Sequence, residues 1–193
     1  MTNLVVVSAG TGIPSLSTKL ADRLADATVR GLGGEVQVKH LELRTLARDL
    51  ADALVGGVRS AALREAFDML CTADGVIAVT PVYNASYSGL FKLFFDMVDR
   101  ETLRGRPVLI AANGGSARHS LMLDTAMLPM FHYLKAFVAP TGVFAATEDW
   151  ADEYLVPRIE RAGTEFAAFM RAHPAPTPED PFAVADFSTL LGN

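Results

Sequence analysis

The stretch LVVVSAGTGIPSLSTKL (residues 4–20) has the pattern of a strand, a turn and the start of a helix. Its first residues form an apolar, mostly β-branched run without polar alternation, which is typical of a parallel strand buried on both faces. Leu16 and Leu20 then begin a helical spacing, and Gly10 and Gly12 lie in the turn before the helix. The first N–H groups of a helix and the helix dipole attract anions. The stretch therefore predicts a phosphate-binding turn after the first strand of a parallel sheet.

Outward from this stretch, strands and helices alternate along the chain. Further strands are predicted at 35–43, 75–80, 107–115 and 136–144, and helices at 16–33, 63–75, 88–99, from about 119 to a break at Pro129, and at 148–172. Right-handed crossovers between such strands give a five-stranded, doubly wound parallel sheet with helices on both faces. Ligands bind beyond the carboxyl ends of the strands in these sheets, so the loops after the first, third and fourth strands are the candidates for a site.

Length and composition predict one domain followed by a tail. The chain has 193 residues, half of them hydrophobic, which is enough for a substantial core at residues 1–173. Residues 174–193 hold four of the ten prolines, so an extended tail outside the core is expected there. The apolar end of the tail, FSTLLGN, either docks on another subunit or belongs to a disordered terminus.

Charge and cysteine content exclude several classes of function. The formal net charge is −5 and no block of like charge stands out, which argues against nucleic-acid binding. Cys71 is the only cysteine, so no intrachain disulfide forms and a reducing compartment is expected. The N-terminus lacks a basic segment of the signal-peptide kind, and no apolar run approaches the roughly 20 residues of a membrane helix. We expect a cytoplasmic protein without metal ligands and without membrane contact.

The first loop is rich in hydroxyl groups. It does not contain the P-loop string, which argues against nucleotide hydrolysis of that kind, and only Gly10 and Gly12 match the dinucleotide fingerprint. A monophosphate dianion fits better, because N–H and O–H donors can wrap it without a required arginine. The hydroxyl side chains predicted to do so are Ser8, Thr11, Ser15, Ser17 and Thr18. The alternative is an ordinary Ser or Thr cap on a helix.

The third and fourth loops carry the other candidate residues. Pro81 directly follows a strand, which predicts an open, extended loop. Val82 and Tyr83 offer an apolar wall to a flat ring, and backbone amides there can bond its polar edge. Gly114 and Gly115 either allow a close approach to a ligand or form a tight turn.

Together these loops resemble those of the NAD(P)H-dependent FMN reductases of the flavodoxin-like superfamily, which include the reductase components of two-component flavin monooxygenases. The resemblance spans roughly residues 3–170 and rests on Ser8 followed by the 15–18 segment SLST, on TPVYNASYSGLFK (80–92) and on GGSARH (114–119). Many members carry an arginine before the Pro-Ser step, where this chain has Thr11 and Ile13.

The resemblance implies a flavodoxin-like three-layer sandwich that uses FMN and NAD(P)H. Ser8, Ser15, Ser17 and Thr18 would hold the FMN phosphate. The residues implied to surround the isoalloxazine are Pro81, Val82, Tyr83, Asn84, Gly114, Gly115 and Ser116. Hydride would pass directly from the nicotinamide to the flavin, so no catalytic side chain is expected. His119 either faces the flavin or a nucleotide phosphate, or is a polar residue at a helix start.

Two other redox functions and one binding function stay open. A quinone or azo reductase would retain its flavin, a flavodoxin-type electron carrier would lack a nicotinamide site, and a nucleotide-binding protein would have no redox activity. A flavin-dependent monooxygenase is the partner that the resemblance implies for the reductase.

The predicted helix at 88–99 is apolar around nearly its whole circumference. Such a helix is buried on all sides. We therefore expect a homodimer or homotetramer interface there, as the resemblance also implies, and the competing explanation is that other elements of the same chain cover the helix.

Overall fold

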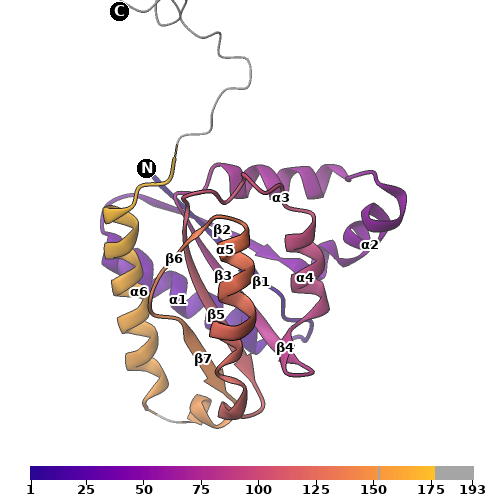
Figure 1. Cartoon of the computed structure of the whole chain (residues 1–193). Coiled ribbons are helices and arrows are strands. Elements are labelled where there is room, and N and C mark those ends of the chain that lie inside the picture. Colours follow the sequence, from indigo (N-terminus) through magenta and orange to yellow (C-terminus); the bar gives the residue numbers. More distant parts are fainter. Residues whose placement is uncertain (152, 177–193) are drawn as a thin grey trace, which may run out of the picture.

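A mostly parallel β-sheet with helices on both faces forms the protein, and the computed structural model describes residues 1–151 and 153–176 (Figure 1). The strands are β1 (Thr2–Ser8), β2 (Val36–Glu42), β3 (Gly75–Tyr83), β4 (Ser86–Tyr87), β5 (Pro107–Gly114), β6 (Phe137–Val138) and β7 (Val143–Ala146). The parallel order is β2-β1-β3-β5, and β6 and β7 both pair with β5. The predicted doubly wound sheet is confirmed, with its fifth position shared by two short strands.

The edge strand is divided because the chain leaves the ladder after Ala139, whose N–H still donates to the Val108 carbonyl at 2.8 Å. β6 pairs with the start of β5 and β7 with its end. Pro140 lies between them, and a proline has no N–H for a ladder hydrogen bond. The predicted single strand at 136–144 is therefore two strands.

The helices divide between the two faces of the sheet. They are α1 (Leu16–Leu32), α2 (Ala47–Gly56), α3 (Ala61–Cys71), α4 (Gly89–Asp96), α5 (Leu128–Tyr133) and α6 (Leu155–Ala172). α1 and α6 pack against Leu4 and Val6, and α2 to α5 belong to the cluster around Val5 and Val7. Successive residues of β1 thus face different layers, which explains why its sequence is apolar without alternation.

The structure adds α2, which the sequence analysis did not predict. Leu50 and Ala53 are buried three residues apart, after a 3₁₀ turn at Leu43–Leu46 that buries Leu43. Gly57 ends the helix with φ +70°, a left-handed conformation that favours glycine. The spacing of these apolar residues and the Gly56-Gly57 stop were the available signals.

The extended loop predicted after Pro81 is wrong. β3 continues to Tyr83, turns at Asn84 (φ 50°) and Ala85 (φ 65°), and returns as β4. β1 pairs with β3 only as far as Val79, so the missing N–H of Pro81 faces no partner strand. The proline therefore does not end the strand.

The predicted break at Pro129 is also wrong. A π-helical stretch at Leu123–Met127 leads directly into α5, and Pro129 lies in the first turn of α5. The first turn of a helix tolerates a residue without an N–H. The preceding 3₁₀ turn covers Ala117–His119.

The remaining differences concern helix ends. The helix predicted at 88–99 is α4, capped by Ser88, and the helix predicted from 148 begins as a 3₁₀ turn at Glu148–Ala151 before α6. Apart from residues 174–176, the predicted tail lies outside the described residues. In the described part of the chain, no helix has the length and apolar character needed to cross a membrane.

Candidate functional site

Three loops that are distant in sequence meet at the carboxyl end of the sheet. They follow β1, β3 and β5, which are neighbours in the strand order. The Thr11 hydroxyl lies 3.2 Å from the Tyr83 hydroxyl, and the Ser17 hydroxyl donates to Asn113 Oδ1 at 2.6 Å. The first bond joins the first loop to the β3–β4 hairpin, and the second joins α1 to β5. The structure therefore brings the three predicted loops together.

The turn between β1 and α1 is tightly built. Ser15 caps α1, and its Oγ accepts the Thr18 N–H at 3.1 Å. A Cβ on Gly10 would lie only 1.9 Å from Ser15 Oγ, so this position requires glycine. Among the described residues, the N–H groups of Leu16 and Ser17 donate no hydrogen bond. Two donors at the start of a long helix are therefore available to an anion.

The five predicted hydroxyl groups do not have equal roles in this turn. Ser8 is buried with its Oγ 3.3 Å from Thr18 Oγ1, and Ser17 is buried with its proton committed to Asn113. Ser15 is used as the helix cap. Thr11 is exposed and Thr18 is partly exposed. The two threonines are thus the hydroxyls available on the solvent side of the turn, because Ser8 and Ser17 are buried and the partly exposed Ser15 is used as the cap.

A buried hydroxyl closes the β3–β4 hairpin. Thr80 Oγ1 accepts the Ser88 N–H at 3.0 Å, and Ser88 Oγ accepts the Phe91 N–H at 3.2 Å as the cap of α4. Both Thr80 and Ser88 are at most 1% exposed. The spacing of Thr80 and Ser88 in the motif TPVYNASYS therefore sets the length of the hairpin. Between them, Tyr83 is 48% exposed at the rim of the site.

The loop after β5 needs glycine at only one of its two glycine positions. A Cβ on Gly114 would lie 3.1 Å from the Phe144 ring and 3.3 Å from Val82 Cβ, so the chain is crowded there. Nothing lies within 4 Å of the position that a Cβ would take on Gly115. Gly114 thus serves internal packing, and Gly115 borders open space.

The same loop continues into a short 3₁₀ turn that begins with Ser116. Ser116 Oγ accepts the Arg118 N–H at 3.4 Å and so caps the turn at Ala117–His119. His119 is partly exposed in this turn. Ser116 therefore lies where the loop predicts it, beside Gly115 at the carboxyl end of β5.

Sequence reasoning missed three residues at this edge: Thr80, Asn113 and Thr147. The Thr147 hydroxyl donates to the Gly114 carbonyl at 3.4 Å, which adds the loop after β7 to the site. Thr80 and Asn113 could have been identified from the sequence, because each is a polar residue at the end of a buried strand. In the described residues there is no group of three His, Cys, Asp or Glu side chains that could hold a metal ion.

Comparison with known proteins identifies the family. The model of the NADPH-dependent FMN reductase family matches residues 2–151. The chain belongs to this family. The predicted family is therefore confirmed, and the family is named for NADPH-dependent reduction of FMN, which agrees with the predicted NAD(P)H-dependent activity.

Relatives in this family are similar over most of their length. The NADH-dependent FMN reductase SfnF of Pseudomonas putida is 36% identical over 173 residues, which cover 87% of this chain and 92% of the relative. The NADPH-type FMN reductase of Escherichia coli K12 is 34% identical over 148 residues, 77% of this chain and 76% of the relative. Both NADH-dependent and NADPH-dependent enzymes are thus among the relatives.

Solved structures confirm the fold. An oxidoreductase from Corynebacterium diphtheriae has 42% identity and a TM-score of 0.85, with 89% of this chain and 98% of the other covered. The apo form of the NADH:FMN oxidoreductase EMOB has 29% identity and a TM-score of 0.77, with 88% and 90% covered. A WrbA-like flavodoxin from Agrobacterium tumefaciens, at 17% identity and a TM-score of 0.64, shares the fold. The flavodoxin-like three-layer fold is therefore as predicted.

Proposed function

We propose that this protein transfers hydride from NADH or NADPH to FMN, and that FMN binds across the carboxyl ends of β1, β3 and β5. The main support for this site is that three loops meet at the carboxyl end of the sheet, where the Thr11–Tyr83 and Ser17–Asn113 hydrogen bonds join them. The edge between adjacent strands of a doubly wound sheet is where such folds bind their ligands. Family membership supplies the reaction.

The turn before α1 fits a flavin phosphate. It presents the N–H groups of Leu16 and Ser17 together with the hydroxyls of Thr11 and Thr18, and Gly10 lets the Ser15 cap pack closely against the turn. Residues 9–18 contain no lysine or arginine. The donors in the turn are therefore neutral, with Ser8 and Ser17 buried beneath them and Ser15 capping α1.

The hairpin and the loop after β5 fit the flat ring of the flavin. Pro81, Val82, Tyr83 and Asn84 provide a wall on the hairpin side, and the half-exposed Tyr83 ring lies at its rim. On the other side, Gly114, Gly115 and Ser116 offer backbone, with open space over Gly115. This arrangement suits a planar group held at both edges.

FMN, when bound, supplies the chemistry by accepting a hydride from the reduced nicotinamide. The residues of the chain orient the ring and exclude water from it, which is catalysis by proximity. Backbone N–H groups of the 114–116 turn can stabilise negative charge that develops on the ring edge. No side chain needs to act as a general acid or base in this scheme.

The test is an anaerobic mixture of the purified protein, FMN and either NADH or NADPH. Loss of the visible absorption of oxidised flavin with one of the donors is expected. Absence of that loss with both donors would contradict the proposed reaction. If the protein is purified colourless and its activity depends on added FMN, flavin is a substrate. If the protein retains its flavin and passes electrons to quinones, it is a quinone reductase.

We also propose that α4 contributes to a homodimer or homotetramer interface. Phe91, Phe94 and Phe95 are buried within the chain, so intrachain packing explains the inner face of α4. Beyond that face, a groove of about 770 Å³ lies between α4 and α5. Its lining includes Tyr87, Phe95, Thr125, Pro129, Met130 and Tyr133. Light scattering that gives the mass of a monomer at micromolar concentration would contradict an interface.

The cellular setting follows from the same proposal. A flavin-dependent monooxygenase that consumes reduced FMN is the proposed partner, and the cytoplasm is the proposed location. A phosphate site made only of uncharged donors suits a reductase that releases reduced FMN to such a partner. Co-purification of the reductase with an oxygenase, or faster oxygenase turnover when the reductase is added, tests the partnership.

A further inference from the structure

Ser17 and Asn113 form a buried link between α1 and β5. Ser17 is the second residue of α1 and 1% exposed, and its hydroxyl donates to Asn113 Oδ1 at 2.6 Å. Asn113 follows Leu109 and Ala111 on the face of β5 that packs on α1 and α6. Because the single Ser17 proton is directed at Asn113, Ser17 cannot donate that proton to a phosphate as well.

The same bond fixes the orientation of the Asn113 carboxamide. An asparagine amide has one acceptor oxygen and two N–H donors. Its oxygen faces Ser17, so the Nδ2 group faces away from it, and among the described residues no acceptor is found for that Nδ2 group. Asn113 is only partly buried. The two Nδ2 donors therefore belong to a carboxamide whose oxygen contacts the first turn of α1, and no described residue accepts a hydrogen bond from them.

The two cations of α1 nearest to the phosphate turn, Lys19 and Arg23, contact an aromatic ring. Lys19 Nζ lies 5.1 Å from the centre of the Trp150 ring, and the Arg23 guanidinium lies 5.4 Å from it. Both cations that follow the phosphate turn thus lie over one aromatic ring. The donors within the turn at residues 9–18 are all neutral, because the turn contains no lysine or arginine.

We propose that Asn113 donates its carboxamide N–H to the flavin phosphate, and that Ser17 is the positioning residue that orients this amide. The inference rests on the proposed binding of FMN at this edge. It assigns the discrimination between phosphorylated and unphosphorylated flavin to one residue of β5, which lies outside the phosphate turn itself.

The test compares the affinities of FMN and riboflavin, which lacks the phosphate, by quenching of flavin fluorescence. Asn113→Asp keeps the acceptor for Ser17 but replaces the donors with a negative charge, so FMN affinity is expected to fall about 100-fold and riboflavin affinity less than about threefold. Asn113→Ala and Ser17→Ala are expected to lower FMN affinity by about tenfold and about fivefold, again with little effect on riboflavin. Ser17→Thr, which keeps the hydroxyl, is expected to restore FMN binding.

Thr28→Ala is the matched control, because it removes another buried hydroxyl of α1 that bonds to the Leu24 carbonyl at 2.8 Å, far from the turn. Both flavin affinities should be unchanged in this variant. Equal losses for FMN and riboflavin in the Asn113 variants would overturn the proposal, since the pair would then only shape the fold. Unchanged FMN affinity would overturn it as well. Wild-type protein that binds neither flavin would overturn the proposed function together with this inference.

Discussion

At the amino end of the sheet, the Arg106 guanidinium donates to three backbone carbonyls, whereas at the carboxyl end N–H groups stay free. Arg106 is 5% exposed and bonds to the carbonyls of Thr102 (2.8 Å), Ala73 (2.6 Å) and Cys71. Burial lowers the pKa of Arg106, and the three carbonyls replace the water that the guanidinium loses. The carboxyl end has hydroxyls, an asparagine amide and unpaired N–H groups.

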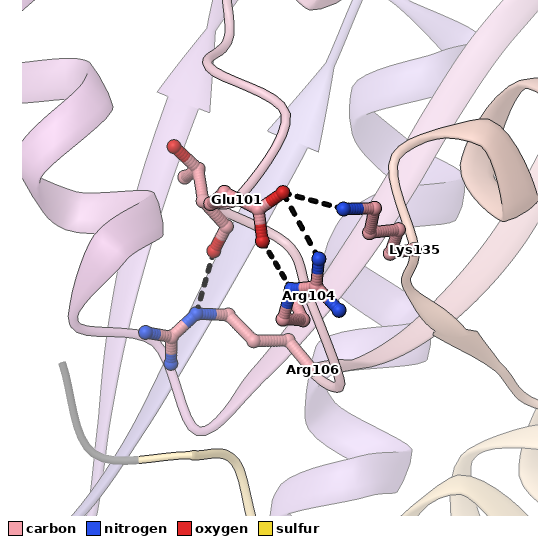
Figure 2. Close-up of polar contacts among 5 residues, drawn as sticks. Glu101, Arg104, Arg106 and Lys135 are labelled. Atoms are coloured by element: carbon pink, nitrogen blue, oxygen red, sulfur yellow. Dashed lines mark hydrogen bonds and ion pairs between the residues drawn. The ribbon is translucent and has the colours of Figure 1, made fainter. Parts of the chain in front are cut away.

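The amino end also carries a surface ion cluster, shown in Figure 2. Glu101 accepts from Arg104 at 3.0 Å and from Lys135 at 2.5 Å. Hydrogen bonds from Arg104 and then from Lys135 lower the pKa of Glu101 to about 2. The two ends of the sheet therefore differ. At the amino end the polar groups of Arg106 and Glu101 are hydrogen-bonded within the chain, and at the carboxyl end, where the ligand is expected, backbone N–H donors stay unpaired. The following changes should affect one end and not the other.

Arg106→Leu should give the largest loss of stability. The carbonyls of Cys71, Ala73 and Thr102 would lose their donor, and all three bonds lie in buried or partly buried surroundings. We expect the free energy of unfolding in urea to fall by about 3 kcal/mol. Arg48→Leu, at an exposed position on α2, should change it by less than about 0.5 kcal/mol. The folded Arg106 variant should bind FMN as tightly as the wild type, because Arg106 lies at the opposite end of the sheet from the proposed site. A loss of stability below about 1 kcal/mol would contradict the structural role of Arg106.

Gly10→Ala should act at the other end. The new Cβ would meet Ser15 Oγ at 1.9 Å and displace the cap of α1. We expect FMN affinity to fall at least about tenfold and stability by about 1 kcal/mol. Gly56→Ala, where no atom lies within 4 Å of the added Cβ, should leave FMN affinity unchanged. Normal FMN binding by the Gly10 variant would show that the shape of this turn is unimportant.

Glu101→Gln tests the ion cluster through pH. Because the pKa of Glu101 is lower in the folded protein than its ordinary value of 4.5, its stabilising contribution is complete above that value and is lost as the pH falls towards about 2. The stability difference between wild type and variant should therefore be constant near neutral pH and shrink in acid. Urea unfolding at a series of pH values measures this difference in the free energy of unfolding. A difference that does not change with pH would show that the ion cluster is not its cause. Added salt should reduce the difference at neutral pH.

Ala85→Gly should give a small gain in stability. Ala85 has φ 65° at the tip of the β3–β4 hairpin, a conformation that costs an alanine about 1 kcal/mol. Relief of this cost should raise the free energy of unfolding by about 0.5 kcal/mol after the greater flexibility of glycine in the unfolded chain is counted. Ala168→Gly, at an exposed position within α6, should instead lower it by about 1 kcal/mol. A thermal shift of the same sign in both variants would contradict the assignment of strain to the hairpin.

Local patterns in the sequence predicted most of the sheet and the three loops that meet at its carboxyl end. β1 is apolar without alternation because it is buried on both faces, and the motif TPVYNASYS is preserved in the hairpin through the Thr80–Ser88 bond. The loop predicted after Pro81 failed because a proline ends a strand only when its missing N–H faces a partner, which depends on where β1 stops.

Long-range pairing within the site was not visible in the sequence. Ser17 and Asn113 lie 96 residues apart, and no local pattern indicates that one hydroxyl is committed to the other side chain. Ser17 was therefore predicted as a phosphate ligand, and the structure places its proton elsewhere. The helix α2 was missed for a different reason, since its apolar stripe is short and only Leu50 and Ala53 are buried in it.

Hydrogen exchange of the backbone amides with and without FMN shows where the flavin binds. The account predicts that FMN slows exchange in residues 9–18, 82–88 and 113–119, and leaves the turn at residues 99–106 unchanged. Protection confined to the groove between α4 and α5, or to the amino end of the sheet, would contradict the placement of the flavin across the carboxyl ends of β1, β3 and β5.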